Sequence, residues 1–133
     1  MTNIATALQT FFGGFNIPAF VEGTVPDKMP DGNGGMVKVE MPYITYRLIQ
    51  PDWVYPVSTF ARVWYRGTSF VPIATKVDEI GRAIGTGKTL NFENGFVTLF
   101  KDTNFCQYVP DESGDKNIKV AYLSLIMHAM EGE

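Results

Sequence analysis

Few residues in this chain could do chemistry, and a glycine-rich stretch that ends in Lys88 and Thr89 is the first of them. The stretch Gly85-Thr86-Gly87-Lys88-Thr89 is similar to the end of a phosphate-binding loop, but the position where that motif needs its first glycine holds Arg82. A phosphate loop also follows a strand and opens a helix, so that helix N–H groups point at the anion. Here a helical pattern precedes the glycines. We therefore interpret them as a helix end and a turn, with nucleotide binding as an alternative.

The only histidine and the only cysteine lack the neighbours that catalysis or metal binding needs. His128 has Glu131 and Glu133 nearby in sequence, whereas a metal site needs several ligands at constrained spacing. Cys106 has no second cysteine and no second histidine in the chain to activate it as a nucleophile. A single cysteine also rules out an intrachain disulfide, which fits a reducing compartment. We predict that the chain is not an enzyme and holds no metal or cofactor.

Two other groups of residues are typical of contact surfaces. Trp53 and Tyr55 lie in a connection bounded by prolines, where exposed aromatic side chains often make interfaces. Asp111, Glu112 and Asp115 lie in an acidic, turn-rich segment that lacks the ligand offsets of a calcium loop. We predict that the two aromatic residues contact a subunit or partner, and that the acidic segment is solvated.

Composition and charge bound the class of protein. At 133 residues the chain is expected to be a single domain, 1–133, with a mobile Gly/Pro-rich loop at 22–35 and an acidic loop at 109–117. The net charge of −3 gives no basic footprint for gripping phosphates, so tight DNA binding is not expected. The longest near-apolar stretch, 120–130, is too short to span a bilayer, and the first residues lack the pattern of a signal peptide. We expect a soluble intracellular protein.

One strand and the helix that follows it organise the rest of the chain. Residues 60–66 are rich in aromatic and β-branched side chains, but polar and small residues do not alternate cleanly among them, which favours a central strand with one partly covered face. Residues 70–84 predict an amphipathic helix, because apolar residues recur there at spacings of four, three and four. That apolar stripe is Ile73, Val77, Ile80 and Ile84.

The remaining segments predict an α+β fold. Their order indicates an antiparallel sheet of about four to five strands, with an N-terminal helix and the central amphipathic helix packed on one face. The expected elements are a helix at 4–12, an extended edge segment at 15–21, a short strand or loop arm at 37–40, a strand at 42–49 antiparallel to 60–66, a connector at 85–94, and strands at 96–101 and 118–127.

The order of the apolar segments resembles the small tail-completion proteins of long-tailed bacteriophages, which are often labelled minor capsid or tail–head joining proteins. The resemblance covers nearly the whole chain and rests on a hydrophobic pattern rather than a catalytic signature. This sequence departs from the pattern in its longer Gly-rich insert, Asp31 to Gly35. The matching stretches are residues 11–20, Val25-Pro26, Pro42 to Tyr46, Ala61 to Ser69, the helix 75–84 and the closing strand 121–127.

The resemblance implies a tail-terminator-like fold and a virion protein assembled in the host bacterial cytoplasm. Members of the family form a homohexameric ring that caps the tail tube and docks to the head connector, with genomic DNA as passing cargo. The implied partners are therefore further copies of the chain, the tail tube protein and the connector, without any membrane. In such a ring we expect Asp111, Glu112 and Asp115 to face the lumen or a ring face. The alternatives are a head-completion or neck protein and a small nucleotide-binding module or enzyme using Lys88, Thr89 or His128.

Overall fold

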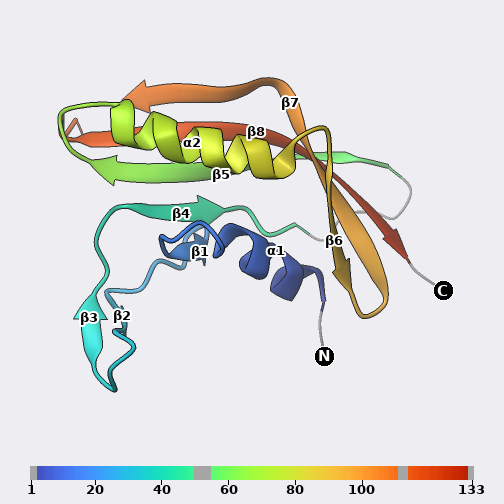
Figure 1. Cartoon of the computed structure of the whole chain (residues 1–133), viewed down its shortest axis with the longest axis horizontal. Helices are drawn as coiled ribbons and strands as arrows, with labels where there is room; N and C mark the ends of the chain where they lie inside the picture. The colour runs from blue at the N-terminus through green and yellow to red at the C-terminus, as the bar shows by residue number, and fades with distance from the viewer. Residues whose placement is uncertain (1–2, 50–54, 111–113, 132–133) are drawn as a thin grey trace.

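The chain folds into a curled sheet of six strands with two helices, and a separate two-stranded hairpin projects from it (Figure 1). The computed structural model describes residues 3–49, 55–110 and 114–131. The α+β class expected from the sequence is confirmed. In chain order the elements are α1 (Ile4–Phe12), β1 (Ala19–Val21), β2 (Lys28–Pro30), β3 (Met36–Lys38), β4 (Tyr43–Tyr46), β5 (Val57–Arg66), α2 (Val71–Ile84), β6 (Lys88–Phe92), β7 (Gly95–Pro110) and β8 (Ile118–Glu131).

Both helices begin and end close to the residues that the sequence indicates. Asn3 caps α1, because its side-chain oxygen accepts the backbone N–H of Thr6 at 3.0 Å. At α2 the Ser69 hydroxyl accepts the N–H of Val71 at 3.0 Å, and Gly85 ends the helix. The predicted apolar stripe of Ile73, Val77, Ile80 and Ile84 is part of the buried face of α2. Helix α1 also buries one face, made of Ile4, Ala7, Leu8, Phe11 and Phe12.

The sheet is larger and less regular than the sequence predicts. Its order is β1-β4-β5-β8-β7-β6, so the expectation of four to five strands is wrong, although β4 and β5 are antiparallel as expected. The edge strand β1 runs parallel to β4, because the chain leaves the sheet between them and re-enters in the same direction. The expected connector at 85–94 contains β6, where a two-residue turn pairs Phe92 with Gly95. A register shift between Lys101 and Cys106 lets β7 continue to residue 110 along β8.

The expected loop at 22–35 is also not a loop throughout, because its second half forms one side of a hairpin. Strand β2 pairs antiparallel with β3, and we call residues 28–38 the arm. The turn is stabilised by Asp31, whose Oδ1 accepts the backbone N–H of Asn33 at 2.7 Å and of Gly35 at 3.1 Å. Gly32 and Gly34 adopt positive φ there, which glycine tolerates without strain. The Gly-rich insert is therefore the tip of a defined hairpin.

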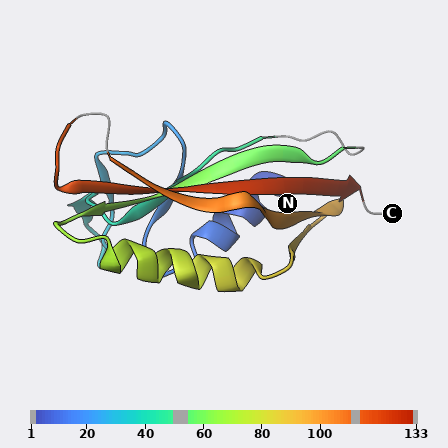
Figure 2. The same cartoon turned by 90° about the horizontal axis from the view of Figure 1, so that it is seen from above.

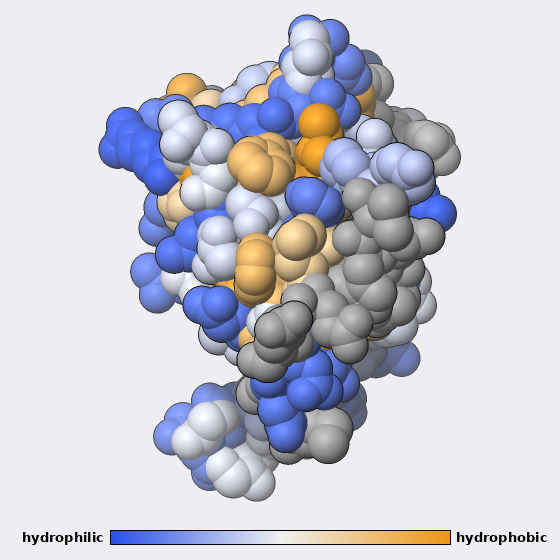
Figure 3. Space-filling view, turned by 90° about the vertical axis from the view of Figure 1, so that its right-hand side faces the viewer, coloured by the Kyte–Doolittle hydropathy of each residue, from blue (hydrophilic) through white to orange (hydrophobic). Residues whose placement is uncertain are grey.

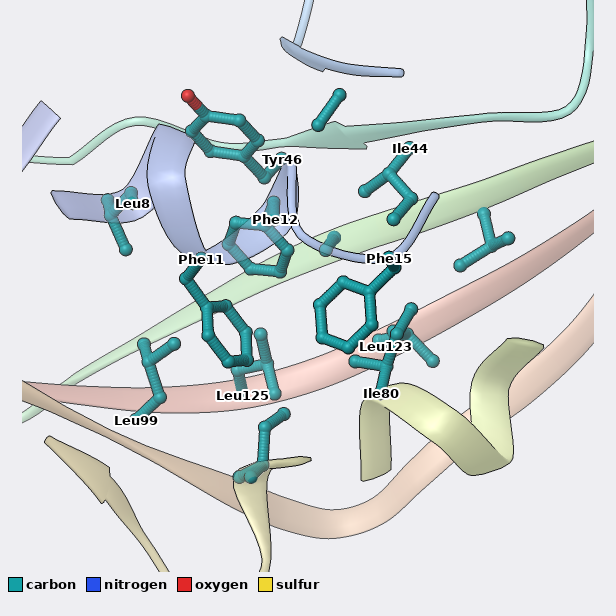
Figure 4. Close-up of a cluster of buried hydrophobic side chains, with 14 of the residues drawn as sticks. Leu8, Phe11, Phe12, Phe15, Ile44, Tyr46, Ile80, Leu99, Leu123 and Leu125 are labelled. Atoms are coloured by element: carbon teal, nitrogen blue, oxygen red, sulfur yellow. The ribbon is translucent and has the colours of Figure 1, made fainter. Parts of the chain in front are cut away.

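One side of the sheet carries the hydrophobic core. Helix α2 lies along the sheet over β5, β8 and β7 (Figure 2), and α1 contacts both edge strands, β1 and β6, so that it bridges the curl. The aromatic ring of Phe12 stacks on Tyr46 at 4.8 Å between centroids. The Tyr46 hydroxyl donates to Gln9 Oε1, and Gln9 Nε2 donates to the carbonyl of Ala19 at 2.9 Å. Leucine, isoleucine and phenylalanine side chains from α1, α2, β4, β7 and β8 meet in this cluster (Figure 4).

Candidate protein-binding site

The side of the sheet opposite the helices, which we call the open face, has none of the described helices packed on it. Between residues 60 and 64 of β5 burial alternates, because Ala61 and Val63 are fully buried on the helix side while Phe60, Arg62 and Trp64 point to the open face and are half-buried. The expectation of a central strand with one partly covered face is therefore confirmed, because β5 lies inside the sheet and these open-face side chains are half-buried. The alternation becomes clear once the aromatic side chains are assigned to the open surface.

Arg62 lies at the centre of the open face. Its Nη1 donates to Glu22 Oε1 at 3.1 Å, which links β5 to the segment that follows the edge strand β1. The guanidinium carbon lies 5.1 Å from the ring centroid of Phe60, 5.9 Å from Trp64 and 5.8 Å from Tyr122. We call these five residues the Arg62 platform. The arginine is held by these contacts while a third of its side chain stays exposed, so it is pre-organised for contact with a partner.

Aromatic rings extend the platform toward the edge of the sheet. The Trp64 indole donates its Nε1–H to the hydroxyl of Thr45 at 2.9 Å, and Thr45 is buried beneath it. Trp64 therefore lies on the open face and not in the core. The Tyr43 ring lies 6.1 Å from Trp64 and 6.0 Å from Phe20 on β1. Aromatic residues and arginine on a half-buried surface are the composition of protein interface centres.

The residues predicted as contacts from the sequence lie away from this platform or outside the described residues. Tyr55 is 70% exposed just before β5, and Trp53 lies outside the described residues. Asp111 and Glu112 also lie outside the described residues. Asp115 pairs with Arg66 of its own chain at 3.1 Å and accepts the N–H of Asn117. The Asn117 hydrogen bond and then the Arg66 guanidinium hold the pKa of Asp115 below its usual value.

The glycine-rich stretch is a helix end, and its backbone donors are in use. Gly85 N–H donates to the Gly81 carbonyl at 2.9 Å, and Gly87 N–H donates to the Ile84 carbonyl at 3.0 Å. The stretch follows the C-terminus of α2, where the helix dipole disfavours anions. Lys88 comes next, at the start of β6, beside a hollow of about 450 Å³ between α1 and β6. We call this hollow the α1–β6 groove. The geometry therefore differs from that of a phosphate loop.

His128 and Cys106 have structural surroundings. His128 lies on β8 opposite Thr98 and is half-buried on the open face. Within 3–49, 55–110 and 114–131, no three histidine, cysteine or acidic residues gather closely enough to hold a metal ion. Cys106 lies opposite Leu123 in the sheet, and burial raises the pKa of its thiol, an effect that a hydrogen bond with Tyr108 partly offsets. Its thiol is therefore protonated near neutral pH, which makes it a poor nucleophile.

Sequence reasoning missed most of the platform. Phe60, Arg62 and Trp64 occupy every second position of a strand, and Tyr122 lies opposite Arg62 on β8. That period of two was present in the sequence, but it was not recognised because polar and small residues do not alternate cleanly along 60–66. Glu22 has no such signal, because it reaches Arg62 only through the parallel pairing of β1 with β4.

Neither described helix has the length and apolarity that crossing a membrane requires.

Comparison with known proteins identified no similar protein. No family model matches the sequence, and no curated protein or solved structure matches it significantly either.

Proposed function

We propose that this chain is a structural virion protein of a long-tailed phage, namely a tail terminator or tail-to-head joining protein. In this proposal, copies of the chain form a ring, a homohexamer by the resemblance, which caps the tail tube and docks to the head connector. The observation that carries the proposal is the Arg62 platform, because a fixed arginine among three aromatic rings is a surface for binding protein.

Two further observations support a structural role. Most of the stretches that resemble the tail-completion proteins, namely 11–20, 42–46, 61–69, 75–84 and 121–127, contribute residues to the core, as a resemblance in fold requires. The arm gives the chain a second surface that reaches away from its body (Figure 1). A ring subunit needs both a surface for its neighbours and a surface for the next component of the tail. On this basis we also propose that the fold is tail-terminator-like.

Charge is consistent with DNA passing through such a ring. The net charge of −3 leaves little attraction for a polyanion that has to move without sticking. Asp115, the described member of the acidic loop, already pairs with Arg66, so its contribution to any lumen charge is reduced. The acidic loop remains part of the proposal as a lining of the lumen or of a ring face.

The deciding experiment is electron microscopy of lysates from a phage in which this gene carries a stop codon. The expected result is over-length or unjoined tails beside DNA-filled heads, restored to virions when the gene is supplied in trans. Free tails of normal length beside emptied heads would instead assign the chain to the neck on the capsid side. Normal virions would refute an assembly function, and a thermal-shift screen with nucleotides and divalent cations would then test the alternative, since a ligand at a hundred times its Kd stabilises by about 2.7 kcal/mol.

A further inference from the structure

The arm exposes aliphatic side chains and an unpaired strand edge. It stands away from the body of the molecule (Figures 1 and 3), with a hollow of about 380 Å³ between it and the segment around β1. Met36 is 61% exposed and Val37 is 48% exposed. A two-stranded hairpin is at best marginally stable alone in water. Exposed aliphatic side chains on such a hairpin, together with the unpaired outer edge of β3, indicate that another surface covers it.

Strand β6 offers a matching acceptor. It is the last strand of the six-stranded sheet, so its outer backbone edge has no described strand beside it. The α1–β6 groove runs along this edge and is lined by Ala7, Phe11 and Leu90 among others. Lys88, at one end of β6, makes no ion pair with any described residue. An unpaired edge beside an apolar groove is the site that an added strand takes in β-augmentation.

We propose that strand β3 of one copy adds to the outer edge of β6 in the next copy. This inference rests on the proposed ring and names the contact that closes it. The arm and β6 lie on opposite sides of the molecule (Figure 1), so the contact is head-to-tail. A head-to-tail contact forms a ring when its rotation closes, whereas a contact between identical patches would stop at a dimer. The occupant of the groove is therefore a second copy of this chain.

Side-chain chemistry selects an antiparallel register for this pairing. This register places Val37 opposite Phe92, and it places Val39, the half-buried residue that follows β3, opposite Leu90. Apolar side chains then meet on the side of β6 that carries Leu90, which lines the groove. The same register places Lys38 opposite Asn91 and diagonal to Glu93, on the other side of the added strand. A shift by one residue would turn Lys38 into the groove and the valines toward solvent.

The other edge of the sheet is a poorer acceptor. Strand β1 has only three residues, against five in β6. Residues of β1 also line the hollow that faces the arm of their own chain, together with Met29 and Pro30. A neighbour's arm would have to displace that arm, whereas the edge of β6 is accessible.

Disulfide trapping in assembled particles tests the inference. In a Cys106→Ser background, Lys38→Cys combined with Asn91→Cys puts two thiols on directly opposed, exposed positions, within reach of a disulfide. Oxidised virions carrying this pair are expected to give a ladder of covalent oligomers on a non-reducing gel, which reduction collapses to one band. The matched control is Lys38→Cys with Thr89→Cys, also exposed but two residues out of register and beyond disulfide reach.

The outcomes separate this contact from the proposed function. A ladder from the Lys38–Asn91 pair and none from the control supports β3–β6 pairing. Absence of the ladder in virions that contain the protein, or a ladder only from the control, overturns the pairing and leaves the ring proposal standing. Absence of the wild-type protein from purified virions overturns the ring proposal itself. As a second readout, Val37→Lys on the exposed arm is expected to lower incorporation into virions at least tenfold, and normal incorporation would overturn the inference.

Discussion

Removing the guanidinium of Arg62 is expected to cost a modest amount of stability and a large amount of partner binding. The Arg62 and Glu22 side chains are 34% and 29% exposed, so solvent screens their ion pair and it contributes about 0.5–1 kcal/mol. One guanidinium cannot stack fully on three rings, so the contacts with the rings together add about 1 kcal/mol. Arg62→Gln should therefore lower the free energy of unfolding by about 1–2 kcal/mol.

Urea denaturation of the purified protein measures this loss, and a double-mutant cycle with Glu22→Gln isolates the ion pair. The coupling energy is expected to be about 0.5–1 kcal/mol. The matched control is Arg82→Gln in α2, whose partner is Asp78 at 3.2 Å. Those two side chains are 81% and 71% exposed, so the loss there should stay below about 0.5 kcal/mol. Equal losses at Arg62 and Arg82 would refute the claim that the platform holds its arginine in place.

Arg62→Gln is expected to weaken partner binding more than it weakens the fold. Removal of an arginine at the centre of an interface costs about 2 kcal/mol or more of binding energy, equivalent to roughly thirtyfold in affinity. Under the proposed function, particles assembled with Arg62→Gln should therefore join heads to tails poorly at a temperature where the variant is fully folded. Infectious titre in a complementation assay measures this, and the Arg82→Gln variant should complement normally. Full titre with Arg62→Gln would show that the open face is not the docking surface.

Three further predictions test the packing and the titrating groups. Gly87→Ala would place a Cβ 2.9 Å from the ring of Phe100 and should lower the free energy of unfolding in urea by about 1–3 kcal/mol. The control Gly67→Ala, with no atom within 4 Å of the added Cβ, should change it by less than about 0.5 kcal/mol. Burial raises the pKa of Tyr46, so the protonated hydroxyl stabilises the fold fully below the unfolded pKa near 10, and this stabilisation is lost as pH rises through the folded pKa. In Tyr46→Phe the free energy of unfolding should therefore fall less with rising pH over that range. The Asp115 carboxyl should titrate below 3.8 by NMR, so it stabilises the fold above its unfolded pKa. In Arg66→Gln its pKa should rise but stay below the usual value, because the hydrogen bond from the Asn117 N–H remains.

Local patterns predicted the elements that depend on local physics. The helices predicted at 4–12 and 70–84 lie close to the observed bounds, because a helix is held by contacts three and four residues apart, which leave a local pattern in the sequence. Strand β6 was missed because its short alternation, with Leu90 and Phe92 on one side, follows glycines that resemble a connector. The parallel placement of β1 could not be read locally, because β4 lies more than twenty residues further along the chain.

The site was harder to predict because its exposure depends on non-local structure. An aromatic strand such as 60–66 has the same composition whether one or both of its faces are buried. Only the position of α2 on the Ala61 side decides that Phe60, Arg62 and Trp64 lie on the open face. Tyr55, by contrast, was located correctly as exposed because proline restricts its connection locally.

The platform and the arm belong to different parts of the chain, and this separation has consequences for assembly. The platform is fixed by long strands at the middle of the sheet, where Arg62 pairs opposite Tyr122. The arm pairs with no strand of the six-stranded sheet among the described residues, so we expect it to adjust to a neighbour without disturbing the platform. A subunit built in this way can close a ring through an adaptable contact while presenting a rigid face to the next component. For the proposed ring, loss of the arm contact should therefore abolish ring formation while the isolated subunit still folds, and loss of Arg62 should leave rings that fail to dock.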